Sequence, residues 1–556
     1  MLYRALLAAL TAALVHTAAA TEVTPNVVLV YVDDMRLDLM GNAGHPYLQT
    51  PNLDRIASEG VKYTNAYVAS PLCGPSRGTL MTGLLPTEHD IRNHSNVWTS
   101  QLSGAAFLPG LIKDAGASNA IIGKWHSGNP STFLPEYDHY FLNRNSVDPD
   151  NPYFAREYND NGTFFTLTDY NTDVMFDELS DYINEQGSTN NPYFVYTSVF
   201  SPHGPFAAAP RHAGTYAGNG VPAVPSQDFA KLPSHLSDIH ERYATQAEMI
   251  LAIDEGLGRM FTALEQAGTL DDTVIIFSSD NGYLFGEHGL YDKALPYQES
   301  VKVPLLVRWG SNIPANQVSE TLVSQADIAV TIADLMGAQL PQGLYGQSLA
   351  NQWRAGTVDA SRQDVVSIQY PISGADPQIP MWATVVTADG WKLVAVPEPD
   401  VLDVDSFGWK YVGLESMLFD LNADPYEMNS LAGGLETAHI EAALTQRLIQ
   451  RLVENAGDTA WVPVRFLAGD TDGDLDIDDT DLGTLFGNYT GPGGGTALGF
   501  YDGDTDGDGD VDDLDLGTAF VNHTGPLAPA SVPEPGGLVA MLVGLSACGL
   551  RRRNRR

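Results

Sequence analysis

Residues 26–34 read NVVLVYVDD, an unbroken apolar run that ends in the two carboxylates Asp33 and Asp34. A continuous run of this kind is typical of a strand that is buried on both faces of a parallel sheet. Open α/β sheets bind their ligands beyond the carboxyl ends of such strands. The stretch therefore predicts a central strand over residues 26–32 and a binding site at its end.

Three further stretches have the same design, in which an apolar run ends in polar residues. They are residues 273–281 (TVIIFSSDN), residues 192–203 (PYFVYTSVFSPH) and residues 120–126 (AIIGKWH). Apolar residues between Met249 and Leu264 follow the 3.6-residue spacing of a helix. Alternating strands and helices predict an α/β fold with a mostly parallel sheet, at one edge of which the polar residues gather.

The pattern of the sequence changes near residue 360. Short β-rich runs precede a helical stretch, which predicts a smaller α+β subdomain after the main sheet. The runs are residues 383–387, 391–396 and 417–420, and the helical stretch is residues 440–456. We expect the main domain over residues 21–358 and the subdomain over residues 359–465.

The 556 residues carry a formal net charge of −40, and 44% of them are hydrophobic. This composition is that of a globular protein, and the chain is long enough for more than one domain. An acidic surface repels nucleic acid, which excludes nucleic-acid binding as a function. An anionic substrate would need a local basic pocket.

Both ends of the chain carry sorting patterns. Residues 1–20 combine a basic residue, an apolar run and small residues, which is typical of a secretory signal peptide. Residues 532–556 contain Val-Pro-Glu-Pro, a short apolar segment and an arginine cluster, and they resemble the PEP-CTERM sorting signal of Gram-negative bacteria. That resemblance implies cleavage by an exosortase, so we expect a secreted or cell-surface protein.

Two cysteines occur in the chain, Cys73 and Cys548. Cys548 lies in the sorting tail and would be removed with it, so a disulfide framework is excluded. From the residues alone, Cys73 is a buried small side chain, a nucleophile activated by His126 or His203, or the precursor of another group.

The neighbours of Cys73 form residues 70–83, SPLCGPSRGTLMTG. We expect a turn at Pro75 and a helix that opens at Ser76 and Arg77. A helix N-terminus attracts anions through its free N–H groups and its dipole. This location favours a functional thiol over one that merely fills the core.

Four of the predicted strand-end residues, Asp33, Asp34, Asp280 and Asn281, present oxygen donors. Hard oxygen ligands select Ca²⁺ or Mg²⁺. Taken singly, the same residues are also common in helix caps and turns.

The pattern Cys73-x-Pro75-Ser76-Arg77 resembles the motif of type I sulfatases, in which the cysteine is oxidised to Cα-formylglycine. Residues 80–83, Leu-Met-Thr-Gly, extend the similarity, which covers about residues 25–465. The resemblance implies an alkaline-phosphatase-like sulfatase core and hydrolysis of sulfate monoesters. It also implies a formylglycine-generating enzyme as a partner.

In the chemistry that the resemblance implies, the hydrated aldehyde is the nucleophile. One hydroxyl of the geminal diol attacks sulfur, and the alcohol leaves. The other hydroxyl is then deprotonated, the carbon–oxygen bond breaks, and sulfate departs as the aldehyde re-forms. A serine could perform the first step but would stay sulfated. A metal ion and fixed cations would stabilise the charge of the transition state.

The resemblance also assigns a metal site. Its ligands would be Asp33, Asp34, Asp280, Asn281 and the formylglycine at position 73. The cation is expected to be Ca²⁺, with Mg²⁺ as the alternative.

The catalytic positions that the resemblance implies are Cys73, Arg77, Lys124, His126, His203 and Lys293. Arg77, Lys124 and Lys293 would form the basic pocket that an acidic surface requires. His126 would hold or deprotonate the diol. His203 would protonate the leaving group, and Lys293 would bind sulfate and assist that protonation.

Residues 66–77 and 279–293 are most similar to N-acetylglucosamine-6-sulfatases and other carbohydrate sulfatases. That similarity implies a sulfated polysaccharide or a glycosaminoglycan-like substrate. Two alternatives stay open. One is a formylglycine-dependent phosphodiester or phosphonate monoester hydrolase, which shares the fold. The other is a surface adhesion protein with an inactive sulfatase body.

Residues 469–525 contain an acidic repeat that resembles the calcium loops of dockerins. The resemblance implies Ca²⁺ binding and a cohesin-like partner, and an acidic spacer made rigid by calcium is the alternative. Leu475 replaces the glycine of the first loop. The expected ligands are Asp470, Asp472, Asp474 and Asp481 in the first repeat, and Asp504, Asp506, Asp508 and Asp515 in the second.

Overall fold

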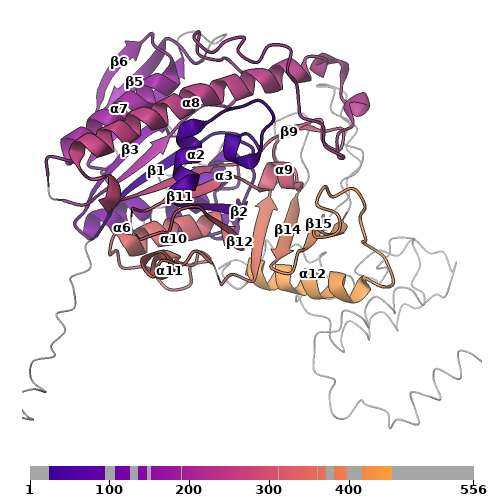
Figure 1. The fold of residues 1–556 in the computed structure, drawn as a ribbon. Helices are drawn as coiled ribbons and strands as arrows, with labels where there is room; N and C mark the ends of the chain where they lie inside the picture. The colour runs from indigo at the N-terminus through magenta and orange to yellow at the C-terminus, as the bar shows by residue number, and fades with distance from the viewer. Residues whose placement is uncertain are drawn as a thin grey trace, which may run out of the picture. The chain divides into compact units, whose positions relative to one another are not determined.

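A ten-stranded sheet forms the centre of the fold, with the strand order β12-β2-β11-β8-β1-β7-β3-β4-β5-β6 (Figure 1). Its four middle strands are β8 (Thr273–Ser279), β1 (Asn26–Val32), β7 (Tyr193–Ser198) and β3 (Ser118–Lys124). All four run parallel to one another. They are the four strands that the sequence predicts, so their carboxyl ends lie at the same edge of the sheet.

The computed structural model describes residues 24–93, 107–125, 135–146, 152–189, 191–310, 312–359, 361–370, 381–396 and 416–453. Two units divide these residues. Among the described elements, the first unit holds the strands, apart from the last residue of the strand Trp391–Ala395, and every helix except α12 (Ala438–Val453), which belongs to the second.

The outer strands make the large sheet mixed rather than wholly parallel. On one side, β2 (Val61–Tyr67) and β12 (Gln317–Ser324) are parallel to each other, whereas β11 (Leu305–Arg308) is antiparallel to both of its neighbours. On the other side, β4 (His139–Ser146) is parallel to β3, and β5 (Arg156–Asp160) and β6 (Thr163–Leu167) follow antiparallel.

Helices cover both faces of this sheet because β1 is apolar on both sides. Val28 and Val30 face α2 (Pro51–Ser58), α7 (Asn171–Gln186) and α8 (Ile239–Ala267). Leu29 and Tyr31 face the opposite layer of α3 (Cys73–Thr82), α6 (Leu108–Asp114), α10 (Gln325–Leu335) and α11 (Ala350–Arg354). Among the described helices, none combines the length and the apolar character that a membrane crossing requires.

A second sheet contains four strands in sequence order, and it follows the main sheet as predicted. These strands are β13 (Asp364–Gln369), β14 (Trp382–Thr387), β15 (Trp391–Ala395) and β16 (Met417–Asp420). The pairs β13–β14 and β15–β16 are antiparallel. The predicted helix over residues 440–456 is present as α12.

Several short elements complete the described chain. They are η1 (Gly41–Ala43), α4 (Pro86–His89), η2 (Phe229–Lys231), η3 (Ser234–Leu236), η4 (Leu270–Asp272), β9 (Leu284–Phe285), β10 (Tyr291–Asp292) and α9 (Gln298–Val301).

A glycine at the end of β3 is predicted to be indispensable. Gly123 has φ of 110°, and a Cβ atom there would lie 2.1 Å from the carbonyl oxygen of Ser198. Gly123→Ala should therefore lower the free energy of unfolding by about 2–5 kcal/mol, through backbone strain and overpacking together. Denaturant unfolding measures this change.

The matched control is Gly110→Ala in α6, where an added Cβ would meet nothing within 4 Å. Alanine is the better helix former, so this variant should be neutral or more stable by up to about 1 kcal/mol. Equal stability of the two variants would contradict the close approach of β3 to β7.

Candidate active site

Cys73 is the first residue of α3, and the helix carries it into the protein interior. Its side chain is fully buried. The expected turn at Pro75 is wrong, because the helix begins three residues before Ser76 and includes the proline. A proline fits the first helical turn because the N–H that it lacks has no partner there in any case. The helix ends at Thr82 and is followed by Gly83, whose φ is 71°.

The carboxylates meet because β1 and β8 are neighbours in register. Val32 pairs with Ser279, so Asp33 and Asp34 leave β1 at the level where Asp280 and Asn281 leave β8. The backbone N–H of Asp34 donates to Asp280 Oδ1 at 3.1 Å. All four residues are buried, and Asp34, the most exposed of them, is 1% exposed. The structure thus brings these four predicted residues together.

The thiol of Cys73 lies between opposite charges. Its Sγ is 3.3 Å from Asp33 Oδ1 and 4.0 Å from Asp34 Oδ1. The ammonium of Lys293 donates to the same sulfur at 2.9 Å. Position 73 therefore contacts the predicted metal ligands and one predicted sulfate-binding cation at once.

Two lysines and a histidine surround the carboxylates. Lys124, at the end of β3, forms a hydrogen-bonded ion pair with Asp33. Lys293 Nζ is 2.5 Å from Asp34 Oδ1, and His203 Nε2 is 3.7 Å from Asp34 Oδ2. His203 follows β7, so each of the four predicted strands supplies at least one group to this cluster.

Arg77 holds Asp280 in place. Its Nε and Nη2 atoms donate to Asp280 Oδ2 at 3.0 and 2.7 Å, and it is fully buried. Its Nη1 atom donates to Tyr196 Oη at 2.8 Å and to Ser198 Oγ at 2.5 Å. The sequence analysis missed Tyr196 and Ser198. Their spacing of two residues in a buried strand, which points both side chains to one face, is the signal that could have revealed them.

Burial and neighbouring charges together shift the pKa values of Asp33 and Asp280 in opposite directions. Burial acts to raise the pKa of Asp33, but the positive charges of Lys124 and its neighbours outweigh it and hold that pKa well below the usual range. Burial and the charge of Asp33 raise the pKa of Asp280 to about 7. Burial also raises the pKa of the Cys73 thiol well above its ordinary value. That direction disfavours a thiolate nucleophile at this position.

The donor set suits a hard cation. Asp33, Asp34, Cys73 and His203 offer ligand atoms that all lie within 4.8 Å of one another. Asn281 Nδ2 donates to Asp34 Oδ1 at 2.7 Å, whereas the buried Asn281 Oδ1 has no hydrogen-bond partner in the structure. Because a buried amide oxygen normally has a partner, a divalent cation bound by Asn281 and the carboxylates would complete the set.

Several predicted site residues lie outside the described part of the chain. These are His126 and the eight aspartates of the acidic repeats, Asp470, Asp472, Asp474, Asp481, Asp504, Asp506, Asp508 and Asp515. The predicted signal peptide and sorting tail lie outside it as well.

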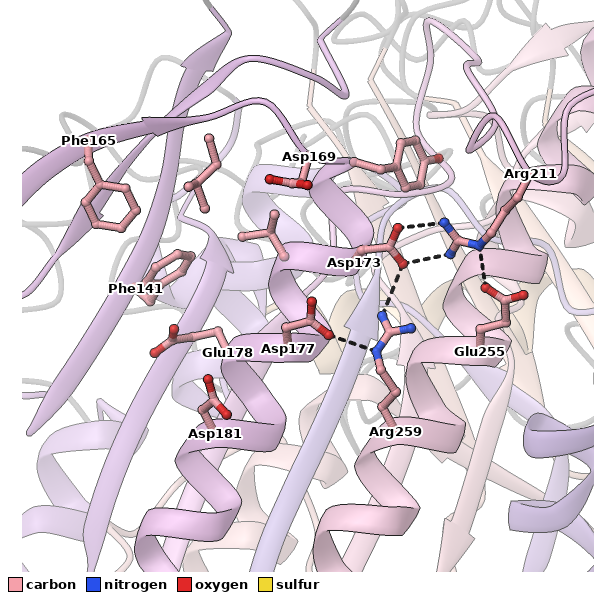
Figure 2. Close-up of a pocket in the computed structure, with 13 residues that line it drawn as sticks. Phe141, Phe165, Asp169, Asp173, Asp177, Glu178, Asp181, Arg211, Glu255 and Arg259 are labelled. Carbon is pink, nitrogen blue, oxygen red and sulfur yellow. Dashed lines mark hydrogen bonds and ion pairs between the residues drawn. The ribbon is translucent and has the colours of Figure 1, made fainter.

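A separate hollow of about 680 Å³ does not suit an anionic substrate (Figure 2). Carboxylates line it, and its two arginines are already paired with them. Arg211 contacts Asp173 and Glu255, each at 2.7 Å, and Arg259 Nη2 contacts Asp173 at 3.1 Å. A sulfate ester would meet uncompensated negative charge there, which favours the Cys73 cluster as the active site.

Comparison with known proteins identifies the family of the chain. The family model named Sulfatase matches residues 25–338, and the model named N-sulphoglucosamine sulphohydrolase, C-terminal, matches residues 286–454. The N-acetylglucosamine-6-O-sulfatase of Bacteroides thetaiotaomicron is 26% identical over 500 residues, covering 76% of this chain and 85% of that protein. PehA of Trinickia caryophylli, a multifunctional alkaline phosphatase superfamily protein, is 27% identical over 518 residues, covering 78% and 96% respectively.

A solved structure of a protein in complex with its substrate, D-glucosamine-2-N,6-O-disulfate, has the same fold. Its TM-score is 0.67 at 24% identity, and the match covers 78% of this chain and 99% of that one. The fold is therefore the alkaline-phosphatase-like fold of sulfatases, with a large mixed sheet and a smaller antiparallel one. Since the first family model spans more than half of the chain, the chain belongs to the sulfatase family and is a sulfuric ester hydrolase.

Proposed function

We propose that this sulfatase hydrolyses sulfate monoesters of carbohydrates and that Cys73, oxidised to formylglycine, provides its nucleophile. The observation that carries the proposal is the position of the Cys73 sulfur. It contacts Asp33 on one side and the ammonium of Lys293 on the other, at the N-terminus of a buried helix. An oxygen nucleophile at this position would lie beside both the proposed metal ligands and the ammonium of Lys293.

A hydrated formylglycine supplies a nucleophilic hydroxyl and, afterwards, a second hydroxyl through which the sulfate is released. The chain's own side chains do the rest. Lys124 and Lys293 place positive charge where the sulfate oxygens must lie, and this charge stabilises the transition state. His203, whose side chain is 29% exposed, would protonate the departing sugar oxygen. Arg77 fixes the orientation of Asp280.

Asp33, Asp34, Asp280 and Asn281 would hold a divalent cation, for which we propose Ca²⁺. The cation would act as a Lewis acid on the reacting oxygens. The three carboxylates are matched by Arg77 and the two lysines. A bound divalent cation therefore gives the cluster the net positive charge that a sulfate ester attracts.

Relatives support a sulfated sugar as the substrate. The N-acetylglucosamine-6-O-sulfatase of Bacteroides thetaiotaomicron acts on a 6-sulfated amino sugar by its name, and it matches 76% of this chain. We propose a sulfated polysaccharide or a glycosaminoglycan-like chain as the substrate class. The assembled set of charged groups disfavours an adhesion protein with an inactive body.

A second candidate is a phosphodiester or phosphonate monoester hydrolase. The similarity to PehA, which covers 96% of that protein, favours this alternative. A phosphodiester carries one negative charge, as a sulfate monoester does, so the cluster could attract both.

We further propose roles for the parts of the chain outside the described residues. Residues 1–20 would direct export, and residues 532–556 would direct cleavage by an exosortase and delivery to the cell surface. The acidic repeats in residues 469–525 would bind Ca²⁺ and either contact a cohesin-like protein or act as a rigid spacer. His126 would assist the diol, and a formylglycine-generating enzyme would modify Cys73.

The mass of the peptide that contains Cys73 tests the proposed nucleophile. In active protein this peptide should be about 18 Da lighter than the encoded sequence, because an aldehyde replaces the CH₂–SH group. Cys73→Ser should keep the fold, as judged by circular dichroism, but lose multiple turnover. Active protein with an unmodified thiol would sink the proposal, as would repeated turnover by the serine variant.

Removal of a single carboxylate tests the cation site. Asp280→Asn should lose one equivalent of bound Ca²⁺, measured by elemental analysis after dialysis, and lower kcat at least about 100-fold. Asp177→Asn, which removes a carboxylate from the hollow in Figure 2, should change neither quantity. A normal metal content in Asp280→Asn would argue against Asp280 as a ligand.

Parallel assays separate the two candidate reactions. We expect the kcat/KM for N-acetylglucosamine-6-sulfate to exceed that for bis(4-nitrophenyl) phosphate by at least about 100-fold. The Bacteroides relative is named for a 6-sulfated amino sugar, and the similar solved structure binds a 6-O-sulfated glucosamine. A preference for the phosphodiester would replace the first candidate with the second.

A further inference from the structure

Lys293 stands in a strained segment of the backbone. Asp292 and Ala294, which flank it, have φ values of 82° and 64°. Residues other than glycine rarely adopt such conformations, each of which costs on the order of 1–3 kcal/mol and persists only where the surroundings enforce it. Something must therefore hold this segment in place.

The second sheet supplies the restraints. In β14, the indole N–H of Trp382 donates to the carbonyl oxygen of Ala294 at 3.0 Å, across 88 residues of sequence. In β15, the ammonium of Lys392 donates to the carbonyl oxygen of Pro296 at 2.5 Å. Glu427 accepts from the backbone N–H of Gln298 at 2.7 Å and also pairs with Lys392.

These contacts are buried and converge on a short stretch. Trp382 and Lys392 are fully buried, and Glu427 is 4% exposed. The main domain adds one restraint, in which the N–H of Ala294 donates to the carbonyl oxygen of Pro71 at 3.1 Å, two residues before Cys73. Ala294, the residue after Lys293, is thus fixed at its N–H by the loop before Cys73 and at its C=O by Trp382.

We propose that Trp382 is a positioning residue for the reaction, because its indole N–H holds the backbone that aims Lys293 at Asp34 and position 73. Without that hydrogen bond, Ala294 can relax toward negative φ and rotate the Lys293 side chain away from its partners. The inference rests on the proposed function of Lys293. According to this inference, the four-stranded sheet contributes to turnover by positioning Lys293, although none of its strands carries a predicted catalytic residue.

The competing interpretation is that Trp382 only fills the protein core. Trp353 in α11 provides a matched control for that interpretation. It is 1% exposed, and its indole N–H donates to Tyr63 Oη at 2.9 Å. Tyr63 lies in β2, so this tryptophan makes the same kind of buried hydrogen bond at a place that supports no predicted site residue. Replacing either tryptophan by phenylalanine removes one N–H and a similar volume.

The test compares Trp382→Phe, Trp353→Phe, Lys293→Ala and the double variant Trp382→Phe/Lys293→Ala in the full-length protein. Both tryptophan variants should lose similar thermal stability. Trp382→Phe alone should lower kcat by about 10- to 100-fold with little change in KM, because a displaced Lys293 weakens transition-state contacts. The loss should be larger for a sugar sulfate than for 4-nitrophenyl sulfate, whose leaving group needs no proton.

In the Lys293→Ala background, Trp382→Phe should have no further effect on kcat/KM, because the residue acts through a side chain that is no longer present. Equal losses in the two tryptophan variants, or full additivity with Lys293→Ala, would overturn the inference. Wild-type turnover in Lys293→Ala would instead refute the proposed role of Lys293, and the inference with it. If Trp382→Phe does not fold, Lys392→Met removes the donor to Pro296 and must give the same pattern.

Discussion

The structure depends on three carboxylates, those of Asp33, Asp34 and Asp280, that share a buried volume at the ends of two neighbouring strands. Uncompensated charge of this density is costly to bury, so each acid needs a positive partner. Arg77, Lys124 and Lys293 supply those partners from three separate elements. The requirement for charge balance thus fixes where α3, β3 and the segment after β10 must lie.

Much of this arrangement could be predicted from the sequence, since buried parallel strands leave long apolar runs. The predicted strand over residues 26–32 has the bounds of β1, and the other three strands differ by a few residues at their ends. Parallel register then brings Asp33 and Asp280 to one edge without any knowledge of the packing. Periodicity and strand-end chemistry are local properties, so a single sequence reveals them.

What the sequence could not reveal depends on contacts between distant residues. Arg77 lies in α3, and its partners Tyr196 and Ser198 lie in β7. The sequence shows polar residues within an apolar run, but it does not show which residues they contact. The hydrogen bond between Trp382 and Ala294 joins the four-stranded sheet to the segment after β10, and neither residue stands in a catalytic motif. The start of α3 at Cys73 was missed because Pro75 suggests a turn, although a first helical turn accommodates it.

The ten-stranded sheet and the four-stranded sheet position different residues of the site. Strand ends of the large sheet carry the carboxylates directly, so those groups are as rigid as the sheet itself. Lys293 instead follows a two-residue strand, and its position relies on hydrogen bonds from the smaller sheet. The ammonium of Lys293, which must contact the substrate in each turnover, thus lies on a strained segment. Hydrogen bonds from neighbouring residues, rather than regular secondary structure, keep that segment in its conformation.

A crystal structure of the active protein, with anomalous scattering recorded for the bound cation, tests the central claim most directly. The account predicts one divalent cation bound by Asp33, Asp34, Asp280 and Asn281, and an oxygen in place of sulfur on the side chain of residue 73. A fully active protein that shows a cysteine sulfur beside carboxylates without a cation would contradict it.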